Sequence, residues 1–260
     1  MGFLIQAACV SDTGKIRKNN EDNLYFHNQL LPVVHRGTGT ILRFQTALRR
    51  RLCMAVFDGM GGENFGEDAS YVAAVRLKQQ CRNWSARFKT NEEFIPECIE
   101  SINEAVVKTK KERGTDRMGT TLVMASFDKE SVWIGSLGDS RAYRLRGKVL
   151  EKLTVDHVSR QPEGSKRKAP LTQYLGIDPD ELLIEPHIVQ IKLKDGDRFL
   201  LCSDGVTDML TEDEISTLML QYVDPDSCAQ ALVDAANSHG GRDNITVIVC
   251  TIIERERRYG

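Results

Sequence analysis

Aspartates recur in this sequence where short apolar runs begin or end. Asp58 follows the run Leu52–Phe57, and Asp204 follows the run Phe199–Cys202. Three further aspartates border apolar runs in the same way: Asp22, Asp139 and Asp243. In an antiparallel sheet the exit of one strand lies beside the entry of the next, so we expect these five carboxylates to gather at one rim.

Such a cluster indicates a metal site, because neighbouring carboxylates repel one another unless a cation neutralises them. An all-oxygen set without cysteine or histidine suits Mg²⁺ or Mn²⁺. Two such ions about 3.5–4 Å apart would bridge and activate a water, making hydroxide available near neutral pH. The chemistry predicted is hydrolysis of a phosphate ester. Taken singly, each aspartate also fits an ordinary turn, since Asp58-Gly59 and Asp204-Gly205 are common hairpin dipeptides.

The segments around these aspartates predict a single mixed domain of strands and helices. Strands are expected at the apolar runs Leu52–Phe57, Thr120–Phe127, Val132–Leu137, Ala142–Leu145, Ile188–Leu193, Arg198–Cys202 and Ile245–Ile253. Helices are expected at Gly66–Arg87, at Asn91–Arg113, after the capping box that joins Thr211 to Glu214, and after Asp224-Pro225. Consecutive strands between Thr120 and Leu145 favour antiparallel hairpins. The segments Leu30–Arg51 and Arg160–Pro170 are expected to be irregular.

Composition narrows the functional class. With 260 residues, 41% apolar and 28% charged, the chain is typical of a globular protein. A net charge of −2 gives no reason to expect nucleic acid or an anionic membrane as partner. The N-terminal residues lack a signal-type apolar core, and the seven cysteines are scattered, so a cytoplasmic protein with reduced thiols is predicted. One domain over residues 1–260 is expected, with Glu254–Gly260 as a tail or the start of a linker.

Two rival motifs fail on their context. The spacing of Cys81 and Arg87 fits a cysteine phosphatase, but the intervening residues include no glycine for a phosphate-cradling loop and fall in a predicted helix. The run from Gly59 to Asn64 lacks the third glycine of a dinucleotide-binding loop.

Seven stretches, in order along nearly the whole chain, resemble the PPM family (type 2C) of metal-dependent Ser/Thr phosphatases in its compact bacterial form. They are Ser11–Gly14 with Arg17 and Asn20–Asn23; Val56–Gly62 with Gly66-Glu67 and Ala69-Ser70; Met118–Thr121; Gly138–Tyr143; Leu153–His157; Leu200–Gly205; and Gly241–Thr246. Each stretch alone is a weak signal, whereas the ordered set is specific. The resemblance implies an α+β sandwich of two antiparallel sheets packed face to face, with helices on both outer faces and a short flap.

The resemblance also assigns roles to individual residues. It implies two Mn²⁺ or Mg²⁺ ions bound directly by Asp58, the Gly59 carbonyl, Asp204 and Asp243, with Glu21 and Asp22 holding metal-bound waters. It implies that Arg17 grips the substrate phosphate, a task that suits a guanidinium group. Asp139, together with Asp204, matches a third, weaker metal site. The implied reaction is in-line attack of the metal-bridging hydroxide on the phosphorus of phosphoserine or phosphothreonine.

Three departures from the family pattern accompany these matches. Met60 stands where some relatives carry a histidine proposed as general acid. Only Val158–Gln173 lies between His157 and the next matching element, so the flap is short, and Leu30–Arg51 is longer than the usual connection.

The expected partners are phosphorylated proteins, namely Ser/Thr kinases and their targets, with no nucleic acid or membrane and with a monomeric chain. The alternative is a catalytically inactive relative that serves as a regulatory binding module. Such relatives typically lose metal-binding acids, and this chain keeps Asp58, Asp204 and Asp243 together with Arg17.

Overall fold

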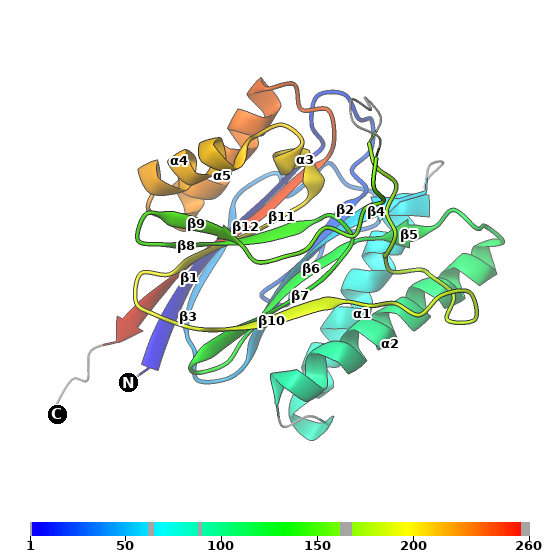
Figure 1. Cartoon of the computed structure of the whole chain (residues 1–260), viewed down its shortest axis with the longest axis horizontal. Coiled ribbons are helices and arrows are strands. Elements are labelled where there is room, and N and C mark those ends of the chain that lie inside the picture. The colour runs from blue at the N-terminus through cyan, green and yellow to red at the C-terminus, as the bar shows by residue number, and fades with distance from the viewer. Residues whose placement is uncertain (1, 62–64, 88–89, 162–167, 256–260) are drawn as a thin grey trace.

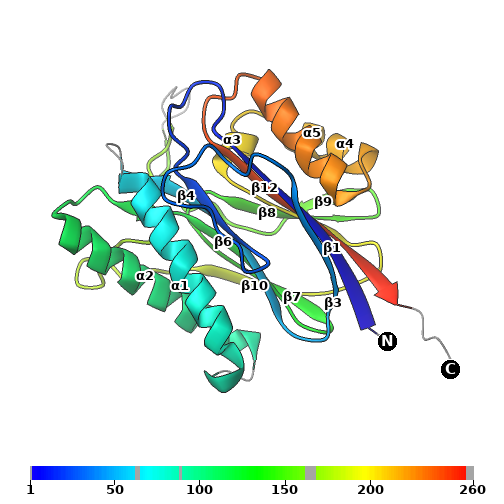
Figure 2. The ribbon, with the colours of Figure 1, turned by 180° about the vertical axis from the view of Figure 1, so that it is seen from behind.

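The computed structural model describes residues 2–61, 65–87, 90–161 and 168–255, and for residues 85–87 it describes the backbone alone. Two antiparallel sheets pack face to face, and helices cover both outer faces (Figures 1 and 2). The predicted α+β sandwich is therefore confirmed.

The first sheet contains the first and the last strand of the chain. Its strand order is β3-β1-β12-β11-β8-β9, with bounds Gly2–Asp12 (β1), Leu42–Ala47 (β3), Arg141–Arg146 (β8), Val149–Lys152 (β9), Arg198–Cys202 (β11) and Ile245–Arg255 (β12). β1 and β12 pair along their whole length, from Gly2 opposite Arg255 to Asp12 opposite Ile245. Glu254 and Arg255 thus belong to the sheet, and residues 256–260 lie outside the described residues.

The second sheet carries most of the acidic rim. Its order is β10-β7-β6-β4-β2 with β5 beside β4, and its strands are Asp22–Phe26 (β2), Leu52–Met60 (β4), Gly119–Thr120 (β5), Leu122–Phe127 (β6), Ser131–Leu137 (β7) and His187–Lys192 (β10). The seven predicted strands are all present in the two sheets. The predicted run Thr120–Phe127 is divided at Thr121 into β5 and β6.

Four longer helices form the outer layers. α1 (Phe65–Arg87) and α2 (Asn91–Arg113) bury their apolar faces against the second sheet, and α4 (Glu212–Gln221) and α5 (Pro225–Ser238) bury theirs against the first. The capping box before α4 is formed, because the Thr211 hydroxyl accepts from the Glu214 N–H and the Glu214 carboxylate accepts from the Thr211 N–H. The four predicted helices are confirmed. No helix in the described ranges has the length and apolar character needed to cross a bilayer.

The prediction that Leu30–Arg51 is irregular throughout is wrong for Leu42–Ala47. This segment forms β3, which pairs with β1 at the edge of the first sheet. Leu42 and Phe44 pack against the core between the sheets, while Arg43 and Gln45 are exposed, which is the period of two of a half-buried strand. The alternation covers too few residues to be evident in the sequence. Of Arg160–Pro170, residues 162–167 lie outside the description, and the remaining ones form neither helix nor strand.

Candidate active site

Pairing of β2 with β4 brings Asp22 and Asp58 together, because the two residues lie directly opposite each other in the register. The end of β4 is held on its other side by Thr121. The Asp58 N–H donates to the Thr121 hydroxyl (3.1 Å), and the Thr121 N–H donates to the Asp58 carbonyl (2.9 Å). Asp58 and Gly59 are therefore strand residues, and the hairpin-turn interpretation does not apply to them.

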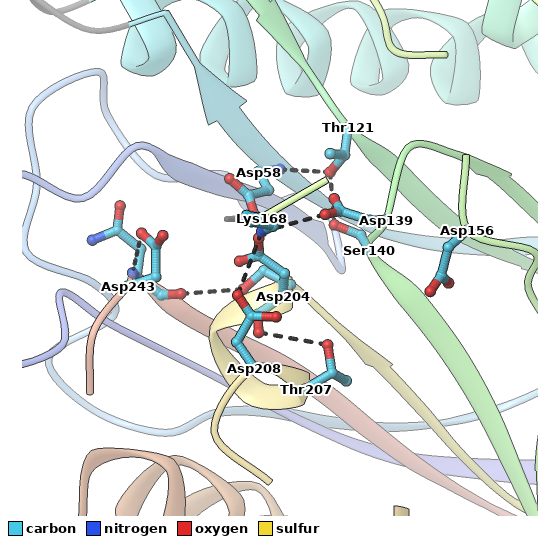
Figure 3. Close-up of polar contacts among 12 residues, drawn as sticks. Asp58, Thr121, Asp139, Ser140, Asp156, Lys168, Asp204, Thr207, Asp208 and Asp243 are labelled. Carbon is cyan, nitrogen blue, oxygen red and sulfur yellow. Dashed lines mark hydrogen bonds and ion pairs between the residues drawn. The ribbon is translucent and has the colours of Figure 1, made fainter. Parts of the chain in front are cut away.

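Asp139 and Asp204 reach the same region from two other strands. Asp139 follows β7, and Asp204 is the first residue of a short helix, α3 (Asp204–Thr207), that directly follows β11. Because α3 begins there, Asp204-Gly205 is not a hairpin turn either. Figure 3 shows Asp58, Asp139 and Asp204 around the Lys168 side chain, with Asp243 to one side of them. The structure thus brings these predicted site residues together at one end of the sandwich.

Asp22 is more deeply buried than Asp139 and Asp204, with 1% of its surface exposed. Its Oδ2 accepts hydrogen bonds from Ser203 Oγ (2.8 Å) and from Thr246 Oγ1 (2.6 Å). Its Oδ1 is buried and has no hydrogen-bond partner among the described residues. Burial raises the pKa of Asp22 to about 7, and the nearby charges of Asp243 and Glu21 add to the increase.

Gly59 lies where three backbone segments meet. Its N–H donates to the Glu21 carbonyl (3.1 Å), and the Glu21 N–H in turn donates to Asn244 Oδ1 (2.8 Å). A Cβ at residue 59 would lie 2.2 Å from the Gly66 carbonyl oxygen and 2.5 Å from that of Glu21. Only glycine allows this approach. Burial raises the pKa of the Glu21 carboxyl, and the neighbouring Glu67 raises it further.

Arg17 and Asp243 form an ion pair at the open side of the rim. The Arg17 Nη2 lies 2.6 Å from Asp243 Oδ2, and the two side chains are 51% and 29% exposed. The hydrogen bond to Asp243 raises the pKa of Arg17. Asn244 joins the Arg17 loop to the start of β12, since its Nδ2 donates to the carbonyls of Thr13 (2.9 Å) and Asn19 (2.8 Å).

Lys168 places a positive charge among the acids (Figure 3). Its Nζ lies 3.3 Å from Asp139 Oδ2 and 3.5 Å from Asp208 Oδ2, and it also contacts Asp204 Oδ2. Asp139 and Asp204, which the family resemblance assigns to a third metal site, thus share this ammonium. Sequence reasoning missed Lys168 and Asp208. The only available signal was the position of Lys168 between two matching family elements.

The acids remain under-neutralised even with this lysine. Burial is the main reason that the pKa of Asp58 lies well above its usual value. The carboxylates of Asp22, Asp139 and Asp243 raise it further, whereas the Lys168 ammonium opposes the shift. A site with this excess of negative charge favours an added cation.

The oxygens at the rim fit a divalent cation. Asp22 Oδ1 and Asp204 Oδ1 are both buried, and neither has a partner within the described part of the chain, which is costly for a carboxylate. Mg²⁺ and Mn²⁺ take such oxygen ligands together with carbonyls and waters. Across the described ranges, no three acidic, histidine or cysteine side chains meet closely enough to hold a metal by themselves. A cation held here would therefore also take ligands other than these side chains, such as backbone carbonyls and waters.

The chain is similar to proteins of known class. The family model for protein phosphatase 2C matches residues 41–235. The serine/threonine phosphatase stp of Listeria monocytogenes is 33% identical over 264 residues, which cover 95% of this chain and 94% of the relative. The crystal structure of the Mycobacterium tuberculosis serine/threonine phosphatase PstP superposes with a TM-score of 0.77 at 26% identity, covering 97% of this chain and 100% of that chain. The catalytic domain of PstP in complex with two manganese ions gives a TM-score of 0.76 at 26% identity, with the same coverage of 97% and 100%.

The two-sheet sandwich of this chain superposes on the solved serine/threonine phosphatase PstP over nearly its whole length. The chain belongs to the protein phosphatase 2C family. The predicted family and enzyme class, a protein serine/threonine phosphatase, are confirmed. None of these relatives favours the alternative of an inactive regulatory module.

Proposed function

We propose that the acidic rim hydrolyses phosphoserine and phosphothreonine in proteins, with two Mn²⁺ or Mg²⁺ ions bound. The observation that carries this proposal is the pair of buried carboxylate oxygens, Asp22 Oδ1 and Asp204 Oδ1, that lack a partner among the described residues. They lie at the rim to which Arg17, half exposed, also belongs.

Each predicted ligand has a defined place in this proposal. The direct ligands are Asp58, the carbonyl of Gly59, Asp204 and Asp243, and the acids that hold waters are Glu21 and Asp22. Bound ions would supply an activated water for attack on phosphorus and would offset charge on the phosphate oxygens. Thr121 contributes by fixing the backbone of Asp58.

Arg17 is proposed to orient the substrate phosphate. Its guanidinium is planar and carries five N–H donors, so it can bind phosphate oxygens while one nitrogen remains on Asp243. The Asn244 amide supports this placement by holding the carbonyl of Asn19, two residues further along the same loop. Met60 has no proton to donate to the leaving oxygen, so this residue takes no part as an acid.

A cavity of about 640 Å³ beside the Arg17 loop provides room for residues that flank the phosphorylated side chain. Its wall includes Lys18 and Arg36, which are basic, and also Val34, a valine that is 87% exposed. The segment that contributes Val33–Arg36 belongs to the long connection Leu30–Arg51, which suggests that this connection contacts the substrate protein. We propose phosphorylated kinases and their targets as substrates.

We also propose that the enzyme is cytoplasmic and monomeric and that residues 1–260 form a single domain. It is proposed to act without nucleic acid or a membrane as partner. All seven cysteines lie in the described part of the chain, and none of them is in a disulfide. Cys81, the residue of the rejected cysteine-phosphatase motif, lies within α1. Free, mostly buried thiols are consistent with a reducing compartment.

The test is hydrolysis of p-nitrophenyl phosphate and of phosphoserine and phosphothreonine peptides. We expect turnover with Mn²⁺ or Mg²⁺, its loss with EDTA and its recovery when metal is added back. Asp58→Asn or Asp243→Asn should lower kcat at least about a hundredfold, or about 3 kcal/mol, while cooperative unfolding is retained.

Asp226→Asn is the matched control, because Asp226 is an acid on α5 whose ion-pair partner is the exposed Arg43. It should keep wild-type turnover. Absence of turnover in the wild-type protein with either metal, or near-normal activity of both Asp58→Asn and Asp243→Asn, would refute the proposal.

A further inference from the structure

Lys168 is an unusual neighbour for carboxylates that are expected to serve divalent cations. Its ammonium group is within 3.5 Å of Asp139 and Asp208 and also contacts Asp204. The side chains of Asp139 and Asp204 are only 10% and 8% exposed, so little water reaches these carboxylates to stabilise their negative charge in place of the ammonium group. The Lys168 side chain is 50% exposed, so it reaches the acids from the solvent side.

The backbone that carries Lys168 is fixed to the rim. Two residues after it, the Pro170 carbonyl accepts a hydrogen bond from the Ser159 N–H (2.9 Å). The His157 N–H donates to the Gly138 carbonyl (2.9 Å), next to Asp139 in the sequence. These bonds keep the lysine close to the acids, so its effective concentration there is high, as for any tethered ligand.

The two oxygens of Asp204 are used differently. Oδ2 contacts Lys168, whereas Oδ1 is buried and has no partner in the described part of the chain. Asp204 can therefore keep its contact with the lysine and still offer an oxygen to a metal ion. Asp139 also turns its Oδ2 toward Lys168, so the ammonium lies between the two carboxylates.

We propose that the ammonium group of Lys168 serves as a built-in cation at the Asp139–Asp204–Asp208 site and excludes a third divalent ion from it. The inference rests on the proposed function, which requires two metal ions at the neighbouring acids. A divalent ion that entered this site would have to displace the ammonium group or lie beside it. Two neighbouring positive charges repel each other strongly in a partly buried site. The chain thus binds two divalent ions, and Lys168 is a positioning residue for Asp204.

The test counts bound Mn²⁺ per chain by equilibrium dialysis, with calorimetric titration for the affinities. We expect two ions for the wild-type protein and for Lys168→Arg, which keeps the charge. Lys168→Gln should bind a third ion at least about tenfold more tightly than the wild-type protein does. Adding Asp208→Asn to Lys168→Gln should weaken this third ion at least about tenfold and leave the first two unchanged.

Lys111→Gln is the matched control, since it removes one lysine whose Nζ lies 2.6 Å from Asp178, an acid outside the rim. It should bind two ions like the wild-type protein. Equal numbers and affinities of ions in the wild-type protein and Lys168→Gln would overturn the inference, and so would loss of an ion in Lys168→Gln. If the wild-type protein bound no Mn²⁺, the proposed function itself would fall, and the inference with it.

Discussion

Replacement of Gly59 by alanine tests how closely the backbone segments of the rim must approach one another. The new Cβ would lie 2.2 Å from the Gly66 carbonyl oxygen, and Cβ atoms essentially never approach other heavy atoms within 3.0 Å. Both close neighbours are backbone oxygens, so rotation of a side chain cannot relieve the contact. The end of β4 must therefore separate from the start of α1 and from Glu21, by about 0.8 Å or more for the Gly66 contact.

This displacement has two consequences of different size. Overpacking of this kind typically costs about 1–3 kcal/mol. For a chain of this length, such a loss lowers Tm by about 2–12 °C, and the protein stays folded. Metal coordination is far less tolerant, because ligand distances must hold to about 0.2 Å. We therefore expect Mn²⁺ affinity to fall at least about tenfold, with a parallel loss of turnover at low Mn²⁺.

The assay combines thermal unfolding with calorimetric Mn²⁺ titration of Gly59→Ala and of Gly135→Ala. Gly135 lies in β7, and a Cβ there would meet only side-chain atoms, the nearest being Ile95 Cγ2 at 3.1 Å. The control should keep wild-type Mn²⁺ affinity whatever its effect on Tm. Wild-type Mn²⁺ affinity in Gly59→Ala would refute the argument that this glycine sets the geometry of the rim.

Two further predictions concern stability away from the metal ligands. Asp197→Ala removes a fully buried carboxylate that accepts two hydrogen bonds from Arg146 (2.6 and 2.7 Å), and urea denaturation should show that the free energy of unfolding falls by about 3–5 kcal/mol. Arg43→Ala breaks an exposed ion pair and should lower it by less than about 1 kcal/mol. Similar losses in the two variants would contradict this prediction. Burial lowers the pKa of His157, whose Nδ1 accepts a hydrogen bond from the Gly138 N–H (3.2 Å). The unfolded chain therefore binds a proton at this histidine more readily than the folded protein does. The stability that His157 contributes above about pH 6.5 is lost as the pH falls through that value. His157→Gln should lose less stability than the wild-type protein between about pH 7 and 5.5, and an identical pH dependence would exclude His157 as a source.

Much of the fold could be predicted because its signals are local. The helix that follows Thr211 begins where the capping box places it, since the bonds between Thr211 and Glu214 involve only neighbouring residues. The apolar run Arg198–Cys202 forms β11 without any change of bounds. Apolar periodicity and helix caps depend on a few residues in succession, so they can be recognised without the tertiary structure.

Elements with weak local signals were missed. β3 at Leu42–Ala47 has an alternating pattern too short to recognise, and it is a strand because β1 lies beside it. The short helix α3 begins at Asp204, where the dipeptide Asp204-Gly205 taken singly also fitted a hairpin turn. In both places the neighbouring elements decide the conformation, as is common for short edge and connecting segments.

The sequence by itself determined which acids stand at strand ends, and with the family resemblance it determined the class of enzyme. Only the tertiary structure decided which acids share a cation. Asp139 and Asp204 both contact Lys168, which comes from a separate segment with no pattern of its own. Ion pairs between distant residues follow from the path of the chain, and Coulomb attraction acts through space whatever the separation in sequence.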